Sequence, residues 1–347
     1  MNVFRLITVS TSVAVAAFGM ALSGAWASAQ SAHEPIRIGI IGLDTSHVIE
    51  FTKLINDPHA PPPLDGCRVV CAFPQGSPDI QSSVSRVPGY IEQMRGMGVD
   101  IVESIDELIG RVDAVLLESH DGRPHLEQVI PVLKAHKPVF VDKPFAGSLV
   151  DVLTIFELVK RYKTPLFSSS SLRFAKNALA ARRGELVGEV LGCDTFSPCT
   201  LEPTHPDLYW YGIHGVEQLF TVMGTGCQSV ARSSTEQCDI AVGVWADGRI
   251  GTFRGMRSGP HDYGGLVLGT TGQKSSGGYE GYDGLVAEIV KFFATGEPPV
   301  SAEETIEIYA FMSAADESKR AGGVPVKLDE VLNKAREEMT LKLQSLQ

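Results

Sequence analysis

The first residues with an evident chemical use follow an apolar run near the start of the chain. Residues 36–41 are Ile-Arg-Ile-Gly-Ile-Ile, typical of a buried strand, and residues 46–56 are typical of the helix that follows. The turn between them contains Gly42, Leu43, Asp44, Thr45, Ser46 and His47. Dinucleotide-binding turns carry G-x-G-x-x-G between such a strand and helix, so that backbone N–H groups can approach a diphosphate. Here Gly42 keeps the first glycine, whereas Asp44 and His47 replace the second and third.

Asp44 acts against phosphate binding at this turn. A helix N-terminus attracts anions through its free N–H groups and its partial positive charge. We predict that Asp44 caps the helix with its own carboxylate and occupies that anion site. Two like charges about 4 Å apart repel by about 4 kcal/mol at an effective dielectric constant of about 20, which is roughly a thousandfold in affinity. The alternative is that Asp44 is only a helix cap and His47 only a packing residue.

The next apolar run, residues 68–73, is predicted to be the second strand. In a dinucleotide fold this strand ends in an acidic residue that binds the adenosine ribose. Here the strand ends at Phe73, and the first acidic residue after it is Asp79. The second anchor for a dinucleotide is therefore also absent from its usual place in the sequence.

The first half of the chain alternates between strand and helix patterns. The further elements are predicted at 88–97 (helix), 100–103 (strand), 105–109 (helix), 113–118 (strand), 124–135 (helix), 138–141 (strand), 149–162 (helix) and 165–168 (strand). Such alternation predicts an α/β fold with a doubly wound parallel sheet. We assign a Rossmann-like nucleotide-binding domain to residues 34–150.

The second half has a different pattern. Runs rich in β-branched residues are separated by Gly and Ser and predict strands at 189–196, 229–232, 240–246, 249–256 and 265–270. Helices are predicted at 212–223, 284–294 and 302–320. The tripeptide Ala246-Asp247-Gly248 predicts a hairpin. We therefore expect a C-terminal α/β domain with an open, mainly antiparallel sheet over residues 151–327, followed by a helix at 328–347.

The start of the chain predicts export. Arg5 is the one charged residue before Glu34, residues 6–22 are largely apolar, and Ala-Trp-Ala and Ala-Ser-Ala end at Ala27 and Ala29. These features are typical of a secretory signal peptide, assigned to residues 1–29, and predict a periplasmic or extracellular protein. A membrane anchor is the alternative, but the apolar core is short and lacks a basic flank on its far side.

The charge and the cysteine content of the chain exclude several classes of partner and site. The net charge of −11, without basic runs, argues against nucleic acid and anionic membrane surfaces. The six cysteines form no C-x-x-C motif, which argues against a zinc ribbon or a thioredoxin-type redox site. Two disulfides are possible, Cys193 with Cys199 and Cys227 with Cys238. Cys67 and Cys71 flank one predicted strand and are too far apart to pair if it is extended.

Several segments together resemble the glucose–fructose oxidoreductase / inositol dehydrogenase / MocA (Gfo/Idh/MocA) family. The matching segments, in the family's order, are 38–42, 112–115, Pro124-His125, Val141-Asp142-Lys143-Pro144, Gly212-Ile213-His214 and 295–301. The resemblance implies a Rossmann domain followed by a domain with an open, mainly antiparallel sheet. It also implies NAD or NADP held between them, oxidation or reduction of a sugar or cyclitol hydroxyl, and a homo-oligomer formed through the open sheet.

The same resemblance implies the catalytic residues. Asp142-Lys143-Pro144 is similar to the family's Glu-Lys-Pro, in which the lysine hydrogen-bonds the reacting hydroxyl. A lysine at the carboxyl end of a buried strand also lies at the crevice where ligands bind such sheets. His214 matches the family's histidine at the start of a helix, but Trp210 stands where the family usually has an aspartate. We take Asp207 as the candidate acid, with Tyr209 and Tyr211 as other proton donors. Lys143 and His214 have alternative roles as a surface lysine paired with Asp142 and as a packed core histidine.

A third polar cluster follows the strand at 113–118. Ser119, His120, Asp121 and His125 lie there, and by resemblance His125 stands at a family histidine. For NAD or NADP we predict contacts from Gly42, Asp44, Thr45, Ser46, His47, Ser119, His120, His125 and Asp142. Imidazoles and carboxylates at Asp44, His47, His120 and Asp121 could instead bind a divalent metal. No spacing such as H-E-x-x-H supports this, so no metal site is predicted.

Three functions are consistent with these residues. The first is a Gfo/Idh/MocA-like oxidoreductase acting on a sugar or cyclitol, with NAD or NADP in an altered pose. The second is an exported lyase, hydrolase or isomerase of sugar derivatives that uses no free cofactor. The third is a carbohydrate-binding protein without turnover.

Overall fold

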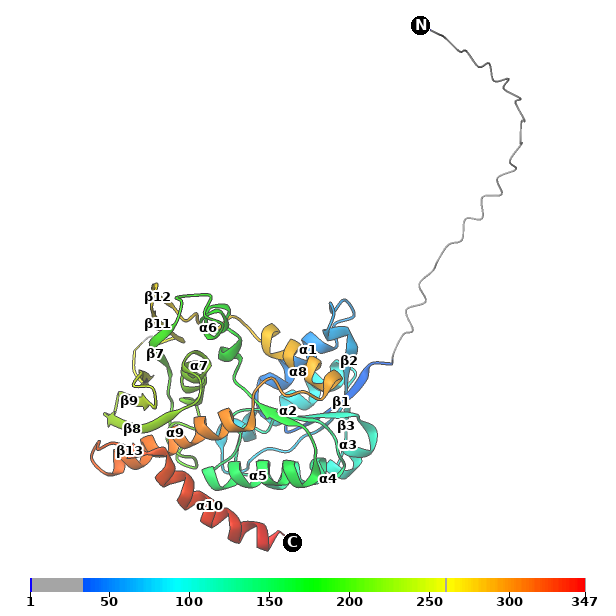
Figure 1. Ribbon diagram of the computed structural model, residues 1–347. Coiled ribbons are helices and arrows are strands. Elements are labelled where there is room, and N and C mark those ends of the chain that lie inside the picture. Colours follow the sequence, from blue (N-terminus) through cyan, green and yellow to red (C-terminus); the bar gives the residue numbers. More distant parts are fainter. Residues whose placement is uncertain (2–33, 260, 347) are drawn as a thin grey trace. The chain divides into compact units, whose positions relative to one another are not determined.

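The computed structural model describes Met1 and residues 34–259 and 261–346, and residues 34–347 form one compact unit (Figure 1). The predicted signal peptide at 1–29 falls outside the described residues, apart from Met1, and stays a prediction. Within the part of the chain that the structure describes, no helix is both long enough and apolar enough to span a membrane.

The first sheet is parallel and has six strands in the order β3-β2-β1-β4-β5-β6. Its strands are β1 (Ile36–Ile41), β2 (Cys67–Phe73), β3 (Asp100–Ile101), β4 (Ala114–Leu117), β5 (Val139–Val141) and β6 (Leu166–Ser168). The strand order reverses between β1 and β4, which is the topological switch point where doubly wound sheets bind ligands. The predicted Rossmann-like sheet is thus confirmed, and its last strand, β6, lies entirely after residue 150.

Helices cover both faces of this sheet. They are α1 (His47–Ile55), α2 (Gln81–Gly96), α3 (Ile105–Arg111), α4 (His125–Lys134) and α5 (Leu149–Tyr162), with the short helix η1 (Leu64–Gly66). Two hydrophobic cores lie on opposite faces of the sheet. Helices α3, α4 and α5 pack on one of them, and α1, α2 and the later helix α8 (Asp283–Thr295) pack on the other. The second half of the chain therefore returns to complete the first domain.

The second sheet has seven strands in the order β12-β11-β7-β10-β9-β8-β13. They are β7 (Val190–Pro198), β8 (Cys227–Ser234), β9 (Cys238–Trp245), β10 (Ile250–Met256), β11 (Gly264–Gly269), β12 (Gly272–Ser275) and β13 (Val326–Lys327). Every pair of neighbouring strands is antiparallel except β7 with β10, so the predicted mainly antiparallel sheet is confirmed. The predicted hairpin joins β9 and β10 and turns at Gly248, whose φ is +88°.

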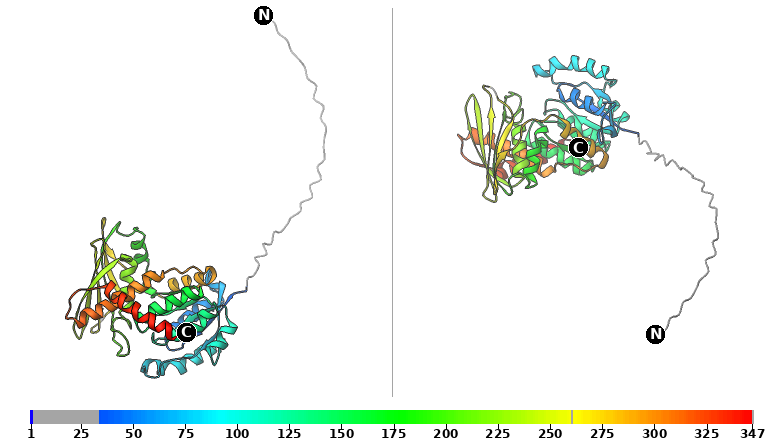
Figure 2. Two further views of the ribbon diagram at one scale, coloured as in Figure 1. Left: turned by 60° about the horizontal axis from the view of Figure 1, so that its bottom comes forward. Right: turned by 90° about the horizontal axis from the view of Figure 1, so that it is seen from above.

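The remaining helices lie on one side of the second sheet, whose yellow-green strands are seen from two directions in Figure 2. They are η2 (Ser171–Phe174), α6 (Lys176–Arg182), α7 (Ile213–Met223), α9 (Ala302–Arg320) and α10 (Leu328–Ser345). Side chains of α7 and α9 form one continuous core with the sheet and with α5. The predicted C-terminal helix is confirmed, and it packs on α5 and α9.

Two expectations differ from the structure. The helix predicted at 88–97 begins seven residues earlier, at Gln81, and contains Pro88 in its first half. Tertiary bonds stabilise this serine-rich first turn, because Ser83 donates to Asp44. All six cysteines lie within the described residues and are free thiols, so neither possible disulfide forms.

Candidate active site

A small polar cavity lies where the carboxyl ends of the parallel strands meet the second domain. Its volume is about 200 Å³. It is lined by Thr45, Ser46, His47, Arg86, His120, Lys143, Ser171, Leu172, Tyr211, His214, Tyr263, Tyr279 and Tyr282. The structure thus brings Lys143 and His214 together, although 71 positions separate them in the sequence. It also adds three tyrosines, Tyr263, Tyr279 and Tyr282, that local sequence patterns did not single out.

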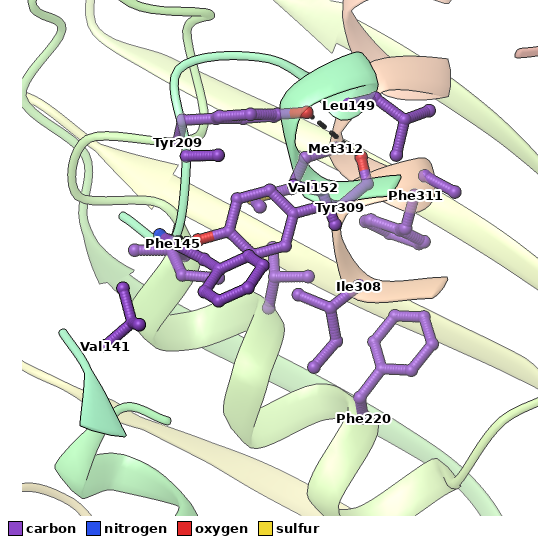
Figure 3. Close-up of a cluster of buried hydrophobic side chains, with 14 of the residues drawn as sticks. Val141, Phe145, Leu149, Val152, Tyr209, Phe220, Ile308, Tyr309, Phe311 and Met312 are labelled. Atoms are coloured by element: carbon purple, nitrogen blue, oxygen red, sulfur yellow. Dashed lines mark hydrogen bonds between the residues drawn. The ribbon is translucent and has the colours of Figure 1, made fainter. Parts of the chain in front are cut away.

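The loop after β5 holds Lys143 at this cavity. Next to it, the Phe145 N–H donates to the Tyr309 hydroxyl of α9 at 2.5 Å (Figure 3). The Phe145 ring also stacks on Phe156. The Lys143 side chain is 5% exposed, and its ammonium lies 5.0 Å from the centre of the Tyr211 ring. Among the described residues it has no hydrogen-bond or ion-pair partner, so a ligand hydroxyl in the cavity can bind it.

His214 is the second residue of α7 and is fixed by a hydrogen bond between its Nδ1 and the Ser170 hydroxyl, at 2.7 Å. The Tyr211 and Tyr263 rings lie edge-on to the imidazole. Burial, followed by the positive charge of Lys143, holds the pKa of His214 well below its usual range. The imidazole is therefore neutral at neutral pH and can accept a proton from a bound hydroxyl.

Asp207 lies elsewhere. Its carboxylate accepts from Arg232 at 2.9 Å and from Lys319 at 2.6 Å, in an ion-pair cluster beside β8 and α9. This arrangement leaves Asp207 without the role of proton donor at the cavity. Tyr209 is also turned away, because its hydroxyl bonds Ser313 at 2.8 Å. Of the acids and tyrosines considered before His214, Tyr211 is the one that lines the cavity.

The turn after β1 has the predicted shape but not the predicted cap. Gly42 has φ of +90°, and a Cβ there would lie 2.5 Å from the Ser119 backbone nitrogen, so glycine is required. The expectation that Asp44 caps α1 is wrong. Ser46 is the N-cap residue, and the Asp44 carboxylate instead accepts from the Ser83 hydroxyl at 2.7 Å and from the His120 N–H at 2.8 Å. Burial raises the pKa of Asp44, and these two bonds oppose the increase.

The segment after β2 packs closely on the turn after β1, the turn at which dinucleotide-binding folds hold a diphosphate. The Gly42 N–H donates to the Phe73 carbonyl at 2.9 Å and the Leu43 N–H to the Gln75 carbonyl at 3.2 Å, so these two donors are already paired. A Cβ added at Gly76 would lie 2.7 Å from Ser83 Oγ and 3.8 Å from Asp44 Cβ, which shows how closely this backbone packs. We call residues 74–86 the covering segment.

Further bonds fix the covering segment across the strand ends. Ser77 donates to Asp121 at 2.5 Å, and Asp79 pairs with Arg123 at 2.8 Å. Arg86 lies 3.3 Å from both the Asp44 carbonyl and His120 Nδ1. With residue 44 fully buried and Phe73 in place of the ribose-binding acid, the residues present do not fit a dinucleotide in the usual pose.

Of the other predicted cofactor contacts, four line the cavity, whereas Ser119, His125 and Asp142 do not. Thr45, Ser46, His47 and His120 line the cavity, and burial, with Lys143, holds the pKa of His120 well below its usual range. By contrast, His125 is fully buried, with Nε2 2.8 Å from the Ser119 carbonyl and Nδ1 3.1 Å from the Phe145 carbonyl. His125 therefore joins the loops after β4 and β5 and supports the site indirectly.

Glu118 is a site residue that the sequence analysis missed as a candidate. It follows β4 directly, and its carboxylate lies with Asp142 and His47 in a group whose ligand atoms are all within 4.8 Å of one another. Asp142 Oδ2 is 2.6 Å from His47 Nδ1. Burial and then the neighbouring Asp142 raise the pKa of Glu118 well above its usual range. An acid at the end of an otherwise apolar strand was the available signal.

Comparison with known proteins agrees with this architecture. Residues 36–169 match the family model described as "Oxidoreductase family, NAD-binding Rossmann fold" (GFO_IDH_MocA). A curated relative, inositol 2-dehydrogenase 3 of Saccharopolyspora erythraea, is 29% identical over 125 residues, which is 35% of this chain and 32% of the relative. The aligned part thus spans about a third of that relative's length.

Solved structures match over a larger part of the chain. A probable dehydrogenase from Thermotoga maritima matches with a TM-score of 0.68 and 23% identity, covering 85% of this chain and all of the other. The scyllo-inositol dehydrogenase of Lactobacillus casei, solved with NAD(H) and scyllo-inositol, matches with a TM-score of 0.69 and 16% identity. The match covers 85% of this chain and 100% of the other. At this identity the structural likeness shows the fold alone. Residues 36–169 therefore match the Gfo/Idh/MocA oxidoreductase family, and the chain as a whole shares the fold of these dehydrogenases.

Proposed function

We propose that this protein is an enzyme that acts on a hydroxyl group of a small sugar or cyclitol bound in the cavity of Lys143 and His214. The observation that carries the proposal is that one cavity is lined by His214 and by the Lys143 ammonium, which has no hydrogen-bond or ion-pair partner among the residues that the structure describes. His214 accepts the proton of the bound hydroxyl while Lys143 stabilises the oxygen that becomes negative. The cavity, about 200 Å³, is smaller than the roughly 300 Å³ at the low end of ligand pockets, which favours a single small ring.

The family supports this substrate class and also a reaction class. Relatives are named inositol dehydrogenases, and the family is described as NAD-binding. Oxidation or reduction with NAD or NADP is therefore one candidate reaction. The close packing of the covering segment on the turn after β1 favours the second candidate, which is elimination, hydrolysis or isomerisation of a sugar derivative without a free dinucleotide.

Cofactor titration separates the two reaction classes. Because Trp210 stacks on His120 with ring centres 4.2 Å apart, a dinucleotide entering this region would alter tryptophan fluorescence. We expect no saturable change with NAD(H) or NADP(H) up to about 1 mM, corresponding to a binding free energy weaker than about −4 kcal/mol. Free N-acetyl-tryptophanamide corrects for absorption by the reduced cofactors. Saturation at micromolar NAD or NADP would establish the oxidoreductase reaction instead.

We also propose that copies of the chain associate through the outer face of the second sheet. This face exposes large apolar side chains, namely Leu191, Phe196, Val244, Ile250, Leu266 and Leu268. They lie on the adjacent strands β7, β9, β10 and β11, and apolar patches of this kind mark interaction surfaces.

Light scattering after size-exclusion chromatography tests this association. We expect a dimer or larger assembly, and we expect Ile250→Lys to weaken it at least about tenfold, because a charge would be buried without a partner. Leu341→Lys is the matched control, since Leu341 is comparably exposed but lies on α10, away from this face. A monomeric wild-type protein would contradict the proposal.

A further inference from the structure

The buried carboxylate of Glu118 differs from most other buried acids of the described chain. Glu217 and Glu304 are paired with Arg173, and Asp239 is paired with Arg232. Glu118 is fully buried, yet within the described residues neither of its carboxylate oxygens has a hydrogen-bond partner. Buried carboxylates are normally paired, hydrogen-bonded or bound to a metal. Glu118 therefore lacks the positively charged partner that Glu217, Glu304 and Asp239 have.

The neighbours of Glu118 are suitable for a metal ion. Asp142 is 1% exposed, and its Oδ1 also has no hydrogen-bond partner among the described residues. His47 places Nδ1 beside the other oxygen of Asp142. The three residues come from the ends of β4 and β5 and from the start of α1, and their ligand atoms all lie within 4.8 Å of one another. Lys143 forms no ion pair with either acid in the described chain, although its positive charge acts to lower the pKa of both Glu118 and Asp142.

We propose that His47, Glu118 and Asp142 bind one divalent transition-metal cation. One imidazole and two carboxylates form a donor set suited to Zn²⁺ or Mn²⁺, and two negative charges balance the ion. Three protein ligands leave a coordination position open, as in catalytic rather than structural zinc sites. Because His47 also lines the cavity, the proposed site borders the cavity. If the proposed function holds, the cation polarises a substrate hydroxyl next to Lys143.

This set differs from the residues weighed in the sequence analysis. Asp44 is bound by Ser83 and the His120 N–H, and Asp121 by Ser77, Arg123 and His205, so both acids already have partners. Of the four residues considered there, His47 alone belongs to the proposed site. The tertiary structure replaces the others with Glu118 and Asp142.

Metal binding by the full chain tests the proposal without any assay of activity. Protein freed of metal with EDTA is titrated with Zn²⁺ and with Mn²⁺ by isothermal calorimetry, and Co²⁺ absorption reports the ligand geometry. We expect one ion per chain, and about 100-fold weaker binding in Glu118→Gln, which keeps the shape of the side chain but removes its charge. His59→Gln, at an exposed histidine, is the control for binding at surface imidazoles.

A thermal measurement covers the case in which Glu118→Gln folds poorly. An ion that binds only the folded chain raises its melting temperature, so wild-type protein should lose stability on chelation and regain it with Zn²⁺ or Mn²⁺. Wild-type protein that takes up neither ion stoichiometrically would overturn the proposal and indicate a proton shared between Glu118 and Asp142. Unchanged binding in Glu118→Gln would also overturn it. Neither outcome depends on finding a substrate, so failure of the proposed function is recognised separately.

Discussion

Lys143→Met should lower the turnover of a sugar or cyclitol substrate by about 10²–10³-fold, the usual range for loss of a group that stabilises negative charge in the transition state. The variant keeps the apolar stem of the side chain and removes the ammonium that lines the cavity beside His214. Substrate consumption is followed by NMR over a panel of sugars and cyclitols, without and with added nicotinamide cofactor. Binding of the substrate should weaken far less than turnover, since the ammonium acts mainly as negative charge develops on the substrate oxygen.

The control for this experiment is Lys134→Met, at an exposed lysine of α4. It removes the same charge away from the cavity and should leave turnover within about twofold of wild type. Turnover in Lys143→Met close to the wild-type rate would remove Lys143 from the proposed mechanism. Binding of a sugar by both proteins, with no substrate ever consumed, would favour the carbohydrate-binding alternative.

Arg173→Met should destabilise the fold by about 3–5 kcal/mol, the range for breaking a buried ion pair from one side. Arg173 is 4% exposed, and its guanidinium binds Glu217 of α7 at 2.6 Å and Glu304 of α9 at 2.8 Å. Removing it leaves Glu217 buried without a positive partner, while Glu304 keeps Arg182. Urea unfolding followed by circular dichroism measures the loss.

A matched exposed pair provides the control for Arg173. Arg183 and Glu185 are also 2.8 Å apart, but both side chains are more than half exposed. Arg183→Met should therefore leave the urea midpoint close to that of the wild type, because water already screens the pair. The double variant Arg173→Met/Glu217→Gln should recover part of the lost stability, since it removes the unpaired charge. Equal effects of the two single arginine variants would show that burial is not the cause.

The Arg173 ion pairs also bear on the cavity. Arg173 belongs to η2, whose Ser171 and Leu172 line the cavity, and Glu217 accepts from the Ser169 hydroxyl at 2.9 Å. The neighbouring Ser170 bonds His214. The same buried charges that join α7, α9 and η2 therefore also position the imidazole. In Arg173→Met we expect substrate binding to weaken before the global fold is lost.

Much of the fold followed from local patterns. The apolar run at 36–41 and the alternation after it predicted the parallel sheet, because strands buried on both faces need continuous apolar residues. Gly42 was recognisable because its turn requires a positive φ. Lys143 and His214 were found through family resemblance, and their positions at the end of a strand and the start of a helix placed them near one crevice. The strand and turn predictions depend on residues close together in the chain, whereas the resemblance depends on the order of short segments along it.

The partners of individual polar side chains required the packed molecule. Asp44 is a residue type that often caps helices, but its carboxylate accepts a hydrogen bond from Ser83, which lies 39 positions later in the chain. Asp207 was expected at the cavity and instead pairs with Arg232, whereas Glu118 joins Asp142 and His47. Sequence periodicity indicates which face of an element is buried. It does not indicate which hydrogen-bond donors and charges from distant elements meet there, since that depends on how helices and loops pack across the sheet edge.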